Sequence, residues 1–113
     1  MDDRGNDDGG PPRAHEVLAR LRAHEAELRA LGVRTLSLFG SVARGDAEPG
    51  SDIDVAVRLG PEFSSGGFDH FGRLEELRER LAAIVGREVD VVAEPVERER
   101  LRRAIEGERV RAF

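Results

Sequence analysis

Apolar residues recur at three- and four-residue intervals in three stretches of the chain, which is the pattern of helices with one buried face. In the first stretch the stripe includes Val17, Leu21 and Leu28, and His24 falls on the same stripe, where we expect it to pack. A glycine follows each stretch directly, at the position where helices commonly end. The pattern therefore predicts helices over residues 14–31, 68–85 and 96–106.

Three shorter segments alternate polar with apolar positions, as half-buried strands do. They cover residues 34–39, 52–59 and 88–93. Residues 40–46 contain two glycines and are expected to turn into a short helix, whereas residues 47–51 and 60–67 are interpreted as a turn and a loop. Strands that alternate with helices in this way predict a layered α/β domain.

Residues 1–12 are rich in Asp, Gly and Pro and carry no hydrophobic pattern, so we expect a disordered tail followed by one domain over residues 13–113. The chain has no segment typical of a signal peptide and no run that approaches the roughly 20 apolar residues of a membrane helix. It also has no cysteine, which excludes disulfides and thiolate chemistry. We therefore expect a soluble protein of the cytoplasm, with no membrane partner.

Charge narrows the classes of partner further. The net charge is −5 and the acidic and basic residues are interspersed, which argues against nonspecific binding of nucleic acid. All 18 basic residues are Arg, so a P-loop lysine is excluded. Any positive charge offered to a phosphate is therefore a planar guanidinium.

Two aspartates interrupt the second predicted strand. Asp52 and Asp54 are separated by one residue, so they point to the same side of the strand, about 7 Å apart, while Ile53 and Val55 point toward the core. Carboxylates at this spacing repel each other, and a divalent cation bound between them turns this repulsion into a net attraction. Mg²⁺ prefers carboxylates together with substrate phosphates, and a pair of such ions suits phosphoryl displacement. A solvated strand face is the alternative interpretation.

Two further segments carry residues suited to the same chemistry. Gly40 and Ser41 follow the first strand, where glycine lets the backbone approach a phosphate closely and Arg44 adds a positive charge nearby. Alone, such a pair is more typical of a plain turn. Asp90 lies within the third predicted strand. If that strand lies beside the second, Asp90 joins the aspartate pair as a metal ligand or as the base that activates an incoming hydroxyl.

The spacing of these residues resembles a known signature. A Gly-Ser pair followed, ten residues later, by Asp-x-Asp is similar to the motif of the DNA polymerase β-like nucleotidyltransferase superfamily. The fuller string GSVARGDAEPGSDIDVAV, residues 40–57, resembles its smallest branch, the minimal nucleotidyltransferases (MNT). The resemblance covers residues 14–113, and the ending IEGERV is also similar to the close of such proteins. It implies a small mixed β-sheet with helices packed on it.

The resemblance also implies roles for individual residues. In that family the Gly-Ser pair contacts nucleotide phosphates, the Asp-x-Asp pair binds Mg²⁺, and an acidic residue on a later strand completes the triad. Carried over, the catalytic and metal-binding roles fall on Asp52, Asp54 and Asp90. The nucleotide contacts fall on Gly40, Ser41, Arg44 and Ser51.

The reaction implied is transfer of AMP from ATP to a hydroxyl, with release of pyrophosphate and with two Mg²⁺ ions at the site. Many minimal nucleotidyltransferases resemble antitoxins that adenylylate a tyrosine of a HEPN-domain toxin, a helical RNase. This chain has no second domain to hold a small acceptor and no tyrosine of its own, which favours an acceptor supplied by such a partner.

Two other functions remain open from the sequence. One is a small-molecule nucleotidyltransferase similar to the aminoglycoside-modifying enzymes. Those enzymes carry an extra helical domain, so here a homodimer would have to build the acceptor pocket. The other is a noncatalytic antitoxin that masks its partner by contact alone.

Overall fold

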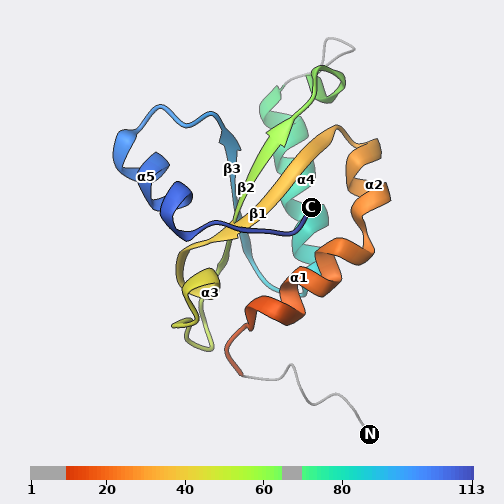
Figure 1. The fold of residues 1–113 in the computed structure, drawn as a ribbon. Coiled ribbons are helices and arrows are strands. Elements are labelled where there is room, and N and C mark those ends of the chain that lie inside the picture. Colours follow the sequence, from red (N-terminus) through yellow and green to blue (C-terminus); the bar gives the residue numbers. More distant parts are fainter. Residues whose placement is uncertain (1–9, 65–69) are drawn as a thin grey trace, which may run out of the picture.

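The chain folds around a four-stranded mixed sheet with helices on both faces (Figure 1). The structure is a computed structural model and describes residues 10–64 and 70–113. The strands lie in the order β3-β2-β1-β4, with β1 antiparallel to both β2 and β4, and β2 parallel to β3. Their bounds are β1 Val33–Phe39, β2 Ile53–Leu59, β3 Val89–Glu94 and β4 Val110–Arg111. This confirms the mixed α/β sheet that the sequence resemblance implies.

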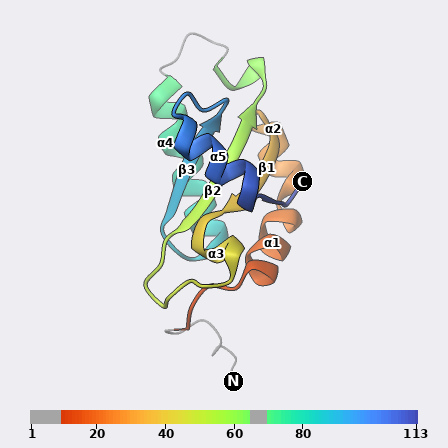
Figure 2. The same ribbon diagram turned by 60° about the vertical axis from the view of Figure 1, so that its left-hand side comes forward.

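The helices divide between the two faces of the sheet. They are α1 Ala14–Ala23, α2 Glu25–Ala30, α3 Gly40–Arg44, α4 His70–Val85 and α5 Glu99–Glu108, with a 3-10 turn, η2, at Pro61–Ser64. Figures 1 and 2 show α1, α2 and α4 on one side of the sheet and α5 on the other, with α3 at the end of β1. In residues 10–64 and 70–113, no helix is both long enough and apolar enough to cross a membrane.

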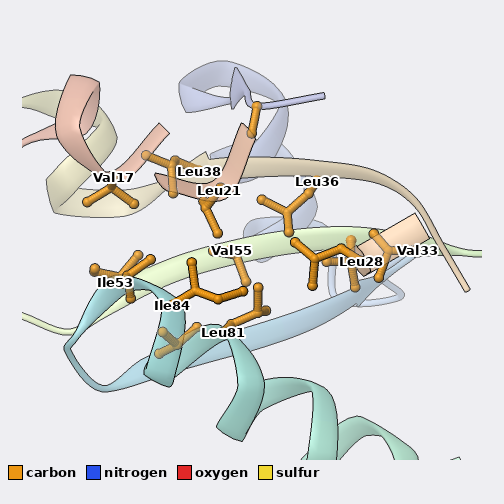
Figure 3. Close-up of a cluster of buried hydrophobic side chains, with 14 of the residues drawn as sticks. Val17, Leu21, Leu28, Val33, Leu36, Leu38, Ile53, Val55, Leu81 and Ile84 are labelled. Atoms are coloured by element: carbon orange, nitrogen blue, oxygen red, sulfur yellow. The ribbon is translucent and has the colours of Figure 1, made fainter. Parts of the chain in front are cut away.

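The larger hydrophobic core fills the layer between the sheet and helices α1, α2 and α4 (Figure 3). Because side chains alternate along a strand, Ile53 and Val55 of β2 enter this core, and Leu36 and Leu38 of β1 lie beside them. Leu81 of α4 is fully buried against them. Asp54 and Ala56 consequently face the opposite side, which is the side that α5 covers.

The first predicted helix is in fact two helices. His24 leaves the helical conformation (φ −109°, ψ 18°), so α1 ends at Ala23 and α2 begins at Glu25. The backbone amide of His24 donates to the Leu21 carbonyl, and its ring Nδ1 lies 3.0 Å from the Arg20 carbonyl oxygen. The apolar spacing continues through this break, which explains why the sequence pattern missed it.

Other boundaries differ by a few residues. β2 begins at Ile53, directly after Asp52, and α5 runs Glu99–Glu108 in place of 96–106, with Gly107 inside its last turn. Strand β4 was not predicted, because two residues are too few to show alternation. Residues 1–9 of the predicted tail and residues 65–69 lie outside the described residues. Within the tail, Pro12 is buried and Arg87 donates to the Gly10 carbonyl.

A second, smaller cluster fixes α5 to its face of the sheet. Ile105 of α5 is fully buried and packs with Phe39 and Ala56. Next to this cluster, Arg109 donates from Nη1 and Nη2 to the two carboxylate oxygens of Glu94, at 3.1 and 2.5 Å. The Glu94 side chain is only 7% exposed, so this ion pair largely determines where the end of α5 lies.

Replacing Arg109 with Met should destabilise the fold, because it leaves the buried Glu94 carboxylate without its partner. We expect the free energy of unfolding at pH 7 to fall by about 2 kcal/mol in urea denaturation. Arg58→Met is the matched control. Arg58 Nε lies 3.9 Å from Glu94 and its side chain is 56% exposed, so its loss should cost less than about 1 kcal/mol.

The same pair predicts a pH dependence. The hydrogen bonds from Arg109 hold the pKa of Glu94 below its ordinary value of 4.5. The pair therefore stabilises the fold fully above pH 4.5, and its contribution is lost as the pH falls through the lower pKa of the folded state. The difference between wild type and Arg109→Met should shrink over that acid range, and equal stabilities at pH 7 would contradict this assignment.

Candidate active site

The end of β1 and the start of β2 meet at a glycine. Gly40 directly follows Phe39 and is the first residue of α3. Its φ is +80°, a backbone conformation that residues with side chains rarely adopt. A Cβ placed on Gly40 would overlap Asp54 Oδ2 and lie 3.1 Å from Asp54 Cγ. The Asp54 carboxylate therefore lies directly on the turn, and only a glycine leaves room for it there.

The parallel pairing of β2 and β3 brings a second carboxylate to the same place. Asp90 is the register partner of Asp54, and both face the α5 side of the sheet. Burial raises the pKa of Asp54, and the negative charges of Asp90 and Asp52 raise it further, opposed by Arg44. Asp54 therefore lies close enough to both other aspartates to be repelled by them.

Ser41 and Asp52 are open to a ligand in different degrees. Asp52 is exposed in the loop just before β2, and Ser41 is half-buried in the first turn of α3. The Ser41 carbonyl accepts hydrogen bonds from the Gly45 and Asp46 amides. Within the described part of the chain, the Ser41 hydroxyl and the Asp54 carboxylate make no hydrogen bond or ion pair, so both can bind a ligand.

Ser51 and Arg44 already have protein partners. The Ser51 hydroxyl accepts a hydrogen bond from the Glu48 amide at 2.8 Å and so closes the turn before β2. Arg44 donates from Nε to Asp46 at 3.2 Å and from Nη1 to Glu108 at 3.0 Å. The predicted contacts of Ser51 and Arg44 with nucleotide therefore stay predictions, and Ser51 has a structural role beside any such contact.

Glu108 is a member of this site that the sequence did not single out. It lies in the last turn of α5, and its Oε1 accepts a hydrogen bond from the Gly40 amide at 2.9 Å. Its negative charge also contributes to the raised pKa of Asp54. The only signal in the sequence was the ending IEGERV, and no spacing rule connects residues 68 positions apart.

The carboxylates suit a hard divalent cation by their chemistry. Asp54 is repelled by like-charged neighbours, and no donor in the described residues forms a hydrogen bond with its carboxylate, a cost that a cation would offset. In residues 10–64 and 70–113, no three His, Cys, Asp or Glu side chains are arranged as a ready metal centre. Asp54 and Asp90 therefore share one face of the sheet, and Asp52 lies just before β2, without the three being assembled as a metal centre.

A separate cavity lies on the opposite side of the sheet. Its volume is about 560 Å³, and Leu31, Phe63 and Leu77 supply its apolar walls while Glu27 and Arg80 stand at its rim. None of the predicted site residues lines it. It provides an alternative place for a ligand, against which the aspartate site can be tested.

Comparison with known proteins identifies the family. The family model described as "Nucleotidyltransferase domain" matches residues 21–112, a span that includes β1, α3, β2 and β3. The chain belongs to this family. The match confirms the resemblance drawn from the Gly-Ser and Asp-x-Asp spacing and shows that the protein is a nucleotidyltransferase by descent.

Individual proteins similar to this chain agree with the family assignment. The chain is 40% identical to the protein adenylyltransferase MntA of Thermococcus cleftensis over 78 residues, which cover 68% of this chain and 73% of that protein. Among solved structures, a candidate minimal nucleotidyltransferase is 28% identical, with a TM-score of 0.66, and the alignment covers 87% of this chain and 94% of that one.

Two structures of complexes share the fold. One is a toxin-antitoxin with AMP-PNP, with 24% identity and a TM-score of 0.62 over 83% of this chain and 72% of that one. The other is a tri-AMPylated HEPN toxin of Shewanella oneidensis in complex with its MNT antitoxin, with 20% identity and a TM-score of 0.51 over 81% and 71% of the two chains. At these identities the likeness shows the fold alone.

Gly40→Ala should disrupt the site, because its methyl group collides with the Asp54 carboxylate. Gly45→Ala is the matched control. Gly45 also has positive φ, but a Cβ there meets nothing within 4 Å. We expect Gly45→Ala to cost about 1 kcal/mol of stability from backbone strain alone and Gly40→Ala to cost more, with loss of nucleotide binding only in the latter. Thermal unfolding and calorimetry measure the two effects, and equal behaviour of the variants would refute the contact.

Asp54→Asn should stabilise the protein at neutral pH. Because the pKa of Asp54 is raised, the folded state binds this proton more tightly than the unfolded state, and stability falls as the pH rises from 3.8 through the raised pKa. The variant removes that cost, so in the absence of divalent cations its unfolding temperature at pH 7 should exceed that of wild type. The gain should vanish below pH 3.8 and be smaller in the exposed control Asp52→Asn. A less stable Asp54→Asn variant at pH 7 would contradict the clustering of carboxylates.

Proposed function

We propose that this protein transfers AMP from ATP to a hydroxyl of a partner protein, with Mg²⁺ held by Asp52 and Asp54 and with Asp90 beside them as the base that activates the hydroxyl. The observation that carries this proposal is the contact of the Asp54 carboxylate with Gly40, with Asp90 beside Asp54 in the strand register. This arrangement joins a tight backbone turn, suited to phosphate, with carboxylates suited to a divalent cation.

Each group has a place in the reaction. The Gly40 amide, the Ser41 hydroxyl and Arg44 would bind phosphate oxygens, and Mg²⁺ would neutralise charge on the triphosphate. The acceptor oxygen attacks the α-phosphorus, the bond from that phosphorus to the bridging oxygen breaks, and pyrophosphate leaves. The hydroxyl proton passes to the carboxylate of Asp90, which is exposed and therefore open to an acceptor.

The relatives support a class of acceptor. The named relative is a protein adenylyltransferase, and the antitoxin of similar fold is bound to an AMPylated HEPN toxin. We propose the same class of acceptor here, a tyrosine of a HEPN-domain toxin, and hence an antitoxin role. The 113 residues contain no tyrosine, which agrees with an acceptor supplied by a partner.

A labelling experiment tests this proposal. The protein is incubated with Mg²⁺, a HEPN-domain protein that co-purifies with it, and ATP labelled on either the α- or the γ-phosphate. Only the α-label should appear on the HEPN protein. Asp52→Asn combined with Asp54→Asn should lower the labelling by about 100-fold or more, because the charge stabilisation of the phosphoryl group is lost.

Glu48→Gln is the control for this experiment, because it removes an exposed carboxylate from the turn before β2 without touching the three aspartates. It should label the partner at the wild-type rate. Absence of α-label on a partner that binds would refute the transfer. Neutralisation of the toxin by the double variant would show instead that contact alone is sufficient.

A further inference from the structure

Glu108 occupies donors that the proposed function assigns to phosphate. Its two carboxylate oxygens are used separately: Oε1 accepts from the Gly40 amide at 2.9 Å, and Oε2 accepts from Arg44 Nη1 at 3.0 Å. A carboxylate that bridges a backbone amide and a guanidinium makes the contacts that a phosphate group would make. A phosphate oxygen cannot take the Gly40 amide while Glu108 holds it.

The position of Glu108 is built into the fold. The next residue, Arg109, is held by both oxygens of Glu94, and one turn earlier Ile105 is fully buried in the second core cluster. The end of α5 is thus fixed on both sides of Glu108. The Glu108 side chain is only 25% exposed, so its contact with Arg44 is not one between two freely moving surface side chains.

Electrostatics makes this position unfavourable for a second anion. Glu108 stands near Asp54, which already has Asp52 and Asp90 as like-charged neighbours. A triphosphate entering the site meets these carboxylates, and the positive charge that acts on Asp54 there is that of Arg44. Arg44 already pairs with Asp46, and as long as Glu108 holds it as well, its positive charge is fully neutralised.

We propose that Glu108 is an internal competitor for the nucleotide phosphates, which leaves Gly40 and Arg44 when ATP binds and so weakens the binding of phosphate-bearing ligands. This inference rests on the proposed function, because it concerns the same site. It makes Glu108 a residue that sets nucleotide affinity. Ligands without phosphate do not compete with it, so their binding does not depend on its charge.

Glu108→Gln tests the inference, because it keeps an acceptor for the Gly40 amide but removes the negative charge. Calorimetry with Mg²⁺ and a non-hydrolysable ATP analogue should show binding about threefold to fivefold tighter than wild type, the effect of one partly exposed charged contact. Adenosine should bind both proteins equally. Glu106→Gln is the matched control, since it removes an exposed charge from the same turn of α5, away from Gly40, and should leave affinity unchanged.

The outcomes separate the two proposals. Unchanged or weaker binding of the analogue to Glu108→Gln, while wild type binds it, would overturn the competitor and leave the proposed function standing. Equally tighter binding of the analogue to Glu106→Gln would also overturn the competitor, because the effect would then come from net charge alone. No binding to wild type or to either variant would overturn both proposals, whereas binding to Glu108→Gln alone would support the competitor.

An NMR titration of the wild-type protein tests the same inference and does not depend on whether a variant folds. Titration with inorganic tripolyphosphate should move the NMR signals of the Gly40 amide and of the Glu108 carboxyl carbon together, with the Glu106 carboxyl carbon unmoved. If the Glu108 signal stays in place while the Gly40 amide responds, Glu108 does not leave, and the inference is wrong.

Discussion

The contact between Gly40 and the Asp54 carboxylate is the constraint on which the rest of this site depends. It needs a residue without a Cβ, a positive φ at the end of β1, and a β2 register that places Asp54 opposite Phe39. When all three hold, a carboxylate lies against a turn whose neighbouring Ser41 hydroxyl is available to a ligand. The chemistry we propose requires this closeness, because the α-phosphate must contact both the turn and the metal held by the aspartates.

The sheet separates stability from chemistry by its two faces. One face carries the larger core against α1, α2 and α4, and it supplies the burial that makes the fold stable. The other face places Asp54 and Asp90 side by side, an arrangement that costs stability through burial and like-charge repulsion. The Arg109–Glu94 pair and the small cluster around Ile105 hold α5 on this second face. Because α5 is fixed there, Glu108 reaches the turn at Gly40.

Local patterns in the sequence predicted much of this arrangement. Alternation assigned Asp54 to the face opposite Val55, and the Gly-Ser and Asp-x-Asp spacing led to the family that the comparisons confirm. The position of Asp90 was predicted only on the condition that the third strand lies beside the second, which the parallel register satisfies. The break at His24, strand β4 and the contact from Glu108 to Gly40 were not predictable. Each depends on a local break that leaves the apolar spacing intact or on contacts between residues far apart in the chain, which periodicity does not encode.

A crystal structure with Mn²⁺ in place of Mg²⁺ and a non-hydrolysable ATP analogue tests the proposed site most directly. Anomalous scattering locates the metal without reference to the protein coordinates. We predict metal at the carboxylates of Asp52 and Asp54, with the phosphates against Gly40 and Ser41. Nucleotide in the cavity between α2 and α4, or metal distant from Asp54, would contradict this prediction.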